Sequence, residues 1–271
     1  MSVHRNKKLL VCASFVALVV VAACVLSERD NDPAARTKNE SLSSHAICRK
    51  TPAVSHCKLT SSSLERIVAL QISSEGKMNL LRAGEMIVSG TSPAELASEK
   101  NQVMDKLLNQ PQVPSDYGDV MIGLYRDKSQ DVLTRDFAVQ HIGLYAQALE
   151  RRGEYDAEAA ESRKLRSALF DAAGETRTII AAAAFRARAD MSVFDPKVDT
   201  NRLDSLLAAC TADAFSDPAS RAMAVQLCGE RRVRPSRPAL EAISGIPSTP
   251  AVLRLSARRA LSLIDGKELA Q

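Results

Sequence analysis

The distribution of hydrophobic and polar residues divides the sequence into three regions. An apolar run from Leu9 to Leu26 follows a short basic segment at residues 1–8. A polar stretch, rich in Ser, Asn, Asp, Lys and Thr, then extends from Ser27 to about Thr60 without helical periodicity. Beyond it, apolar residues recur at helical intervals, and no segment alternates with the period of a β-strand. The pattern predicts a leader, a flexible tether and an all-α body.

The leader has the layout of a secretory signal, with a basic start, an apolar middle and small residues at its end. The four residues "VAAC" at 21–24 resemble the lipobox of bacterial lipoproteins, in which a cysteine is acylated after cleavage. The resemblance implies that Cys24 becomes a lipid-modified first residue. The alternatives are cleavage after Ala23 without lipidation, and an uncleaved anchor formed by the 18 nearly uninterrupted apolar residues from Leu9 to Leu26. All three place the body on the extracytoplasmic face of a membrane, in the cell envelope.

We therefore expect four parts: a signal peptide or membrane anchor at 1–23, a tether at 24–60, an N-terminal helical cap at 61–114 and helical repeats at 115–271. A flexible tether of this length has a reach of about 30–35 Å, which holds a folded body clear of lipid headgroups.

Two cysteines of the tether, Cys48 and Cys57, are accompanied by His45 and His56. This set has neither a CxxC pair nor the usual histidine spacing of a zinc site, so we expect no metal and no cofactor. In an oxidising compartment a Cys48–Cys57 disulfide is the favoured prediction, with unpaired or intermolecular thiols as the alternative.

Helix starts in the body are marked by hydroxyl residues. "SSLE" at 62–65 and "SPAE" at 92–95 have the capping-box pattern, and Pro93 occupies the first helical position of the second. Ser216 and Thr249, which stand shortly before prolines, predict two later starts.

An internal repeat appears when four segments are aligned on arginines spaced by 42, 44 and 33 residues. Small or apolar residues stand three and seven positions after each arginine, and a second apolar helix precedes it, as stacked helix pairs require. Some of these arginines are expected to bind carbonyls or aspartates of adjacent turns. The aligned arginines are Arg135, Arg177, Arg221 and Arg254; the residues three positions later are Ala138, Ile180, Ala224 and Ala257; those seven positions later are Ile142, Ala184, Cys228 and Leu261.

The phrases "SDPASRAMAVQLCG" at 216–229 and "STPAVLRLSARRALSLI" at 248–264 resemble HEAT repeats, whose second helix follows an Asp- or Pro-containing turn and carries an Arg followed three residues later by Ala. The resemblance spans about 117–266. One segment, "LERRGEYDAEAAE" at 149–161, looks more like a tetratricopeptide-repeat turn. Either resemblance implies a right-handed superhelical array of antiparallel helix pairs, an α-solenoid.

Charge narrows the class of partner. Removing the leader, with Arg5, Lys7 and Lys8, lowers the formal net charge from +4 to +1, so we expect no nucleic-acid partner. An arginine-rich stretch near the C-terminus instead predicts a basic patch for an acidic protein, an anionic headgroup or a cell-wall polymer, with a solvated loop plus structural arginines as the alternative. The patch residues are Arg231, Arg232, Arg234, Arg237, Arg254, Arg258 and Arg259.

The body carries no nucleophile, nucleotide or metalloprotease motif. Its one histidine, His141, lies on a predicted helix and is expected to be a packed side chain. The carboxylates of "GEYDAEAAESRK" at 153–164 are expected to form a solvated helix face. Cys210 and Cys228 would stand at different heights on antiparallel helices, which predicts two core thiols instead of a disulfide.

The sequence thus predicts a membrane-tethered, exported scaffold that binds a protein or an anionic envelope component and is not an enzyme. The alternative is an accessory subunit or an envelope enzyme whose site the sequence does not reveal.

Overall fold

The computed structural model describes residues 93–266, which belong to a compact unit spanning 56–271. Within 93–266 the chain forms helices and turns and no strand, as predicted. The predicted leader, tether and their residues Cys24, Cys48 and Cys57 lie outside the described residues. The helices are α4 Pro93–Leu108, α5 Tyr117–Arg126, α6 Val132–Arg152, α7 Ala160–Ala173, α8 Ile180–Met191, α9 Thr200–Ala212, α10 Pro218–Glu230, the 3-10 turn η2 Arg234–Ser236, α11 Arg237–Gly245 and α12 Ala251–Ile264.

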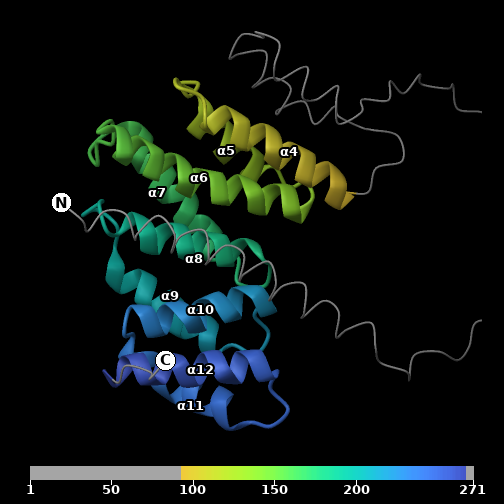
Figure 1. Cartoon of the computed structure of the whole chain (residues 1–271), viewed down its shortest axis with the longest axis vertical. Helices are drawn as coiled ribbons and strands as arrows, with labels where there is room; N and C mark the ends of the chain where they lie inside the picture. The colour runs from red at the N-terminus through yellow and green to blue at the C-terminus, as the bar shows by residue number, and fades with distance from the viewer. Residues whose placement is uncertain (1–92, 267–271) are drawn as a thin grey trace, which may run out of the picture. The chain divides into compact units, whose positions relative to one another are not determined.

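The helices form hairpin pairs that stack in two layers (Figure 1). The first helices α5, α7, α9 and α11 each pack against the helix that follows them. The second helices form a continuous row in the order α6, α8, α10, α12, and α4 packs against α6. This arrangement within the described residues is compatible with a helical-repeat fold.

Glycines allow neighbouring second helices to approach closely. A Cβ added to Gly143 of α6 would lie 2.5 Å from the Cβ of Ala187 in α8. A Cβ added to Gly229 of α10 would lie 2.7 Å from the Cα of Ala260 in α12. Larger side chains at these points would separate the second helices.

The predicted register of the repeat is correct for the buried positions. All four residues that follow the aligned arginines by three are fully buried, and so are three of the four that follow by seven. The exception, Leu261, is half-buried because it lies on α12, the last described helix. Arg177 departs from the pattern: α8 begins three residues later, so this arginine is exposed on the preceding turn.

Two of the aligned arginines close their own helix pair. Arg135 donates from Nε to the carbonyl oxygen of Tyr125 at 2.8 Å, and Arg221 donates from Nε to that of Thr211 at 3.1 Å. In both cases the acceptor is ten residues earlier, at the end of the first helix, where carbonyls lack partners within the helix. The expectation that some repeat arginines are structural is confirmed.

The helix starts agree in part with the predictions. Pro93 is the first residue of α4, as expected. The cap of α10 is Asp217 and not Ser216, because the aspartate carboxylate accepts from two amides of the first turn. Thr249 is no cap either, because Pro250 occupies the N-cap position of α12 and no side-chain hydrogen bond caps this helix.

Candidate functional site

The seven arginines predicted to form one basic patch divide into two groups. Some make hydrogen bonds or ion pairs within the fold, and the others are exposed. Arg231 belongs to the first, because its Nε donates to Asp204 Oδ1 at 2.6 Å and its Nη1 to Ser192 Oγ at 3.3 Å. Arg237 forms an ion pair with Asp265, which joins the start of α11 to the end of α12. These two side chains are paired with carboxylates of the fold, and Arg237 remains 40% exposed.

Arg254 also serves the fold, because its Nη1 donates to the carbonyl oxygens of Pro247, at 2.6 Å, and Thr249. The four other arginines are exposed. Among the described residues only Arg258 of these four has a partner, a marginal 3.5 Å contact with the carbonyl oxygen of Ser244. The exposed arginines are Arg232, Arg234, Arg258 and Arg259.

Arg232 is held in a costly conformation. Its φ of 55° lies in the left-handed region that favours glycine. It ends α10 in a Schellman motif: its N–H donates to the carbonyl oxygen of Gly229 at 3.0 Å, and the N–H of Val233 donates to that of Cys228 at 2.8 Å. Strain of this kind is concentrated at sites where the side chain is used, which makes Arg232 a candidate contact residue.

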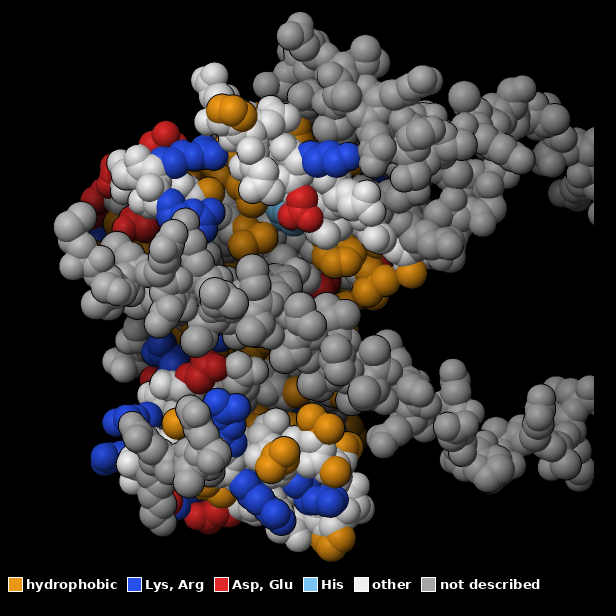
Figure 2. Space-filling view, in the orientation of Figure 1, with side chains coloured by type: hydrophobic (Ala, Val, Ile, Leu, Met, Phe, Trp, Pro, Cys, Tyr) orange, Lys and Arg blue, Asp and Glu red, His pale blue; other side chains and the backbone are white. Residues whose placement is uncertain are grey.

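Exposed hydrophobic side chains lie near the exposed arginines of α12. Phe215, in the turn before α10, is 81% exposed, and Leu255 of α12 is 69% exposed. Ile246 and Val252, on either side of the turn before α12, are also exposed. Because α10 packs against α12, their turns are neighbours, and Figure 2 shows hydrophobic and basic side chains mixed over this end of the array. We call this surface the C-terminal corner: Phe215, Ile246, Val252, Leu255, Arg258 and Arg259.

The hydrophobic members of the corner were not among the site residues predicted from the sequence. The available signal was weak: Phe215 stands between polar residues in "TADAFSDP" at 211–218, a turn composition that does not bury an aromatic ring. Leu255 fits the apolar period of its helix, so its exposure depends on whether another helix covers it.

Charge is distributed unevenly along the described chain. Residues 218–266 contain eight arginines against three carboxylates, whereas 93–217 contain fifteen Lys and Arg against twenty-one Asp and Glu. Within the described residues, all members of the corner except Phe215 therefore lie in the positively charged part, and Phe215 lies just before it.

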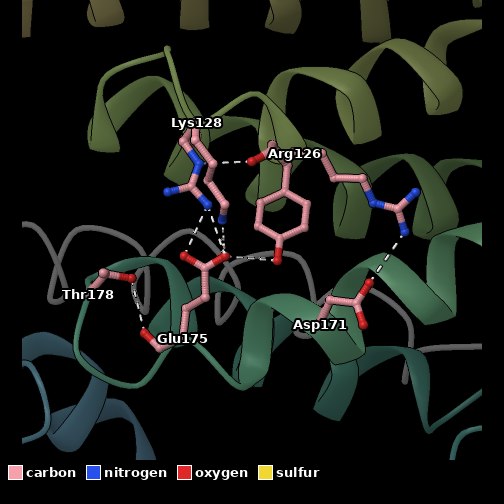
Figure 3. Close-up of polar contacts among 7 residues, drawn as sticks. Arg126, Lys128, Asp171, Glu175 and Thr178 are labelled. Atoms are coloured by element: carbon pink, nitrogen blue, oxygen red, sulfur yellow. Dashed lines mark hydrogen bonds and ion pairs between the residues drawn. The ribbon is translucent and has the colours of Figure 1, made fainter.

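Glu175 joins the first two helix pairs through a polar cluster (Figure 3). Its carboxylate accepts from Arg135 Nη2 at 2.9 and 3.0 Å, from Lys128 Nζ at 2.7 Å and from Tyr125 Oη at 3.0 Å. Burial opposes its ionisation, but these three donors outweigh burial and hold the pKa of Glu175 below its ordinary value. Beside the cluster lies a more exposed ion pair, in which Arg126 Nη2 and Asp171 Oδ2 are 3.3 Å apart.

Asp195 anchors the connection between α8 and α9. Its buried carboxylate accepts from Arg166 Nη1 at 2.7 Å and from Tyr155 Oη, which extend from α7 and from the α6–α7 connection. Burial acts to raise its pKa, and the bonds from Tyr155, Arg166 and the amide of Lys197 more than offset this, so the pKa of Asp195 is lowered. The cluster therefore stabilises the fold by linking the α6–α7 connection to the α8–α9 connection.

His141 is a packed side chain, as predicted. Its Nδ1 lies 2.7 Å from Tyr117 Oη, its Nε2 lies 3.0 Å from Asn101 Oδ1, and burial lowers the pKa of His141 to about 4. The imidazole is therefore neutral at pH 7, and its two nitrogens lie between the hydroxyl of Tyr117, which also contacts the carbonyl oxygen of Met104 at 3.2 Å, and the side chain of Asn101. Both ring nitrogens thus have side-chain partners from neighbouring helices.

Arg188 of α8 is a buried cation that packs against an aromatic ring of α7. It lies 5.0 Å from the ring centroid of Phe170, and Arg202 of α9 lies 3.8 Å from the same centroid. Burial lowers the pKa of Arg188, and its Nε has no hydrogen-bond partner within the described chain. The ring supplies part of the lost solvation through cation–π contacts.

Two further groups of residues lie close to where the sequence predicts them. Cys210 and Cys228 are buried free thiols, as predicted, and burial raises the pKa of Cys210 to about 11. The acidic residues at 154–158 are solvated as expected, but they lie in the connection before α7 and not on a helix, because Gly153 ends α6. Within 93–266 no helix is long and apolar enough to cross a bilayer, and no His, Cys, Asp or Glu cluster has the geometry of a metal site.

No protein-family model matches the sequence, and no curated protein and no solved structure matches it either.

Proposed function

We propose that this chain is an exported helical-repeat scaffold that is held at a membrane through its N-terminus and binds a protein partner on its second-helix layer. The stacked pairs and the HEAT-like motifs support a right-handed superhelical array. An array of this kind binds through an extended, rigid surface and needs no bond chemistry.

The observation that carries the proposal is the polar bracing between successive second helices. Gln147 Nε2 of α6 donates to Asp190 Oδ2 of α8 at 3.3 Å. Arg186 of α8 pairs with Asp190 on its own helix and with Glu230 Oε2 of α10 at 3.1 Å. A surface whose side chains are already fixed across three helices loses little conformational entropy when a partner binds.

Site-specific photo-crosslinking tests this surface. A photoreactive residue replaces Gln226, which is exposed on α10, in the membrane-associated full chain. The matched control places it at Ser167 of α7 or Ser205 of α9, which are exposed on the first-helix layer. We expect a discrete adduct from position 226 and none from the controls. Equal labelling from both layers would contradict a dedicated binding face.

Intact-mass measurement of membrane-extracted protein tests the tether separately. We expect loss of the leader and the added mass of acyl chains, both abolished in the Cys24→Ser variant. A full-length, unacylated mass would exclude the lipoprotein and leave the uncleaved anchor.

A further inference from the structure

We propose that the C-terminal corner rests on an anionic phospholipid surface. The inference rests on the proposed tethering to a membrane and adds a second contact, made by the folded body itself.

Exposed apolar side chains at protruding turns are the first observation. Phe215 is 81% exposed and lies between helices, and Leu255 is the most exposed hydrophobic residue of α12. Exposed apolar side chains of this size suit the interfacial zone of a bilayer.

The second observation is the residue that α12 presents at the position where the preceding second helices are covered by their neighbours. Arg258 follows its repeat arginine by four positions, as Val139, Ala181 and Val225 do in the preceding second helices. Those three are completely buried because the next pair covers them, whereas Arg258 is exposed. A charged residue at this contact position disfavours the docking of a further apolar helix. Lipid is therefore favoured over a protein helix as the occupant.

The turn before α12, which leads into the helical part of the corner, is held in place by hydrogen bonds and prolines. Arg254 donates to two carbonyl oxygens of the segment before α12, and Pro247 and Pro250 stand in that segment. Val252, Leu255 and Arg259 are spaced by three and four residues and so lie on one face of α12. Apolar and cationic groups are thus presented together, as interfacial binding requires.

Charge complementarity selects the headgroup. The described chain carries its excess of arginine after residue 218 and its excess of carboxylate before it. Near an anionic bilayer this asymmetry turns the corner toward the surface and the acidic helix pairs away from it. Guanidinium groups such as Arg258 and Arg259 can bind phosphate oxygens in bidentate fashion.

The absence of tryptophan from the sequence permits a clean test. The full chain is reconstituted with a single reporter, Phe215→Trp or Leu255→Trp, in vesicles of brominated phosphatidylglycerol or brominated phosphatidylcholine. The control reporter is Val193→Trp, at a position 86% exposed in the α8–α9 connection and outside the corner. We expect quenching of both corner reporters in phosphatidylglycerol only, and none of the control.

Arginine variants complete the test. Arg258→Gln and Arg259→Gln should each lower the ratio of docked to undocked corner by about fivefold. Arg151→Gln, an exposed arginine at the end of α6, is the matched control and should leave quenching unchanged. Quenching that is equal in both lipids, absent in both, or shared by the Val193→Trp control would overturn the lipid contact.

The membrane-tethered scaffold and the lipid contact of the corner can be overturned independently of each other. Sedimentation of the chain with both kinds of vesicle reports the tether, while quenching reports the corner. A chain that sediments and gives the position 226 crosslink without quenching would keep the scaffold and exclude the lipid contact. Protection of the corner only when the crosslinked partner is present would assign the corner to that protein and overturn the inference.

Discussion

Arg232 ends helix α10 in the left-handed conformation that Gly153 adopts at the end of helix α6, with φ of 55° and 72° respectively. Both residues occupy the same place in a Schellman motif, and only glycine adopts it without steric cost. We predict that Arg232→Gly raises the free energy of unfolding by about 1 kcal/mol. Urea denaturation measures this change.

The reciprocal variant Gly153→Arg is the control, and it should lower the free energy of unfolding by about the same amount. If Arg232→Gly were destabilising, the Arg232 side chain would have to contribute contacts that exceed its backbone strain.

Close approach of α10 and α12 predicts a steric effect at Gly229. An added Cβ would meet the backbone of Ala260 at 2.7 Å, so Gly229→Ala should destabilise the fold by about 1–3 kcal/mol despite the better helix propensity of alanine. Gly123 of α5 has nothing within 4 Å of the same added atom. Gly123→Ala should therefore stabilise by up to about 1 kcal/mol. Thermal unfolding of the two variants must show shifts of opposite sign.

The cluster around Glu175 predicts unequal effects for two neighbouring carboxylates. Glu175→Gln removes the charge that faces the largely buried Arg135 and should cost about 2 kcal/mol. Asp171→Asn removes only the half-exposed pair with Arg126 and should cost less than about 0.5 kcal/mol. Equal losses in chemical denaturation would mean that burial of the partner does not matter here.

The same carboxylate contributes to acid sensitivity. Because the pKa of Glu175 is lower in the folded chain than its ordinary 4.5, its contribution is complete above that value and is lost as the pH falls through the folded pKa. The Glu175→Gln variant should lack this part of the acid transition.

His141 makes the free energy of unfolding depend on pH in a higher range than Glu175 does. Burial lowers its pKa from 6.5 to about 4, so the unfolded chain takes up a proton first as the pH falls. The stabilising contribution is complete above pH 6.5 and is lost between that value and about 4. Between pH 7 and 5 the free energy of unfolding should fall by about 2 kcal/mol on this account. In His141→Gln this part of the slope should vanish; an unchanged slope would assign it to other groups.

Local periodicity was sufficient to predict the helix pairs and the buried positions after each repeat arginine. It misplaced Arg177, because the alignment could not show that α8 begins a turn later. The arginine-rich composition that predicts one basic patch also could not show which of its arginines are paired within the fold. The acceptors Asp204 and Asp265, which commit Arg231 and Arg237 to the fold, stand 27 and 28 residues from their partners. Contacts at such separations depend on how helix pairs stack, which local pattern does not specify.

The bonds from Arg135 to Tyr125 and from Arg221 to Thr211 have a consequence for the order of folding. Each spans only ten residues and lies within one helix pair, so a pair can close before its neighbour is in place. Contacts of such short sequence separation cost little loop entropy and form early. A chain built in this way can acquire structure one hairpin at a time, with the longer-range ion pairs fastening hairpins that are already formed.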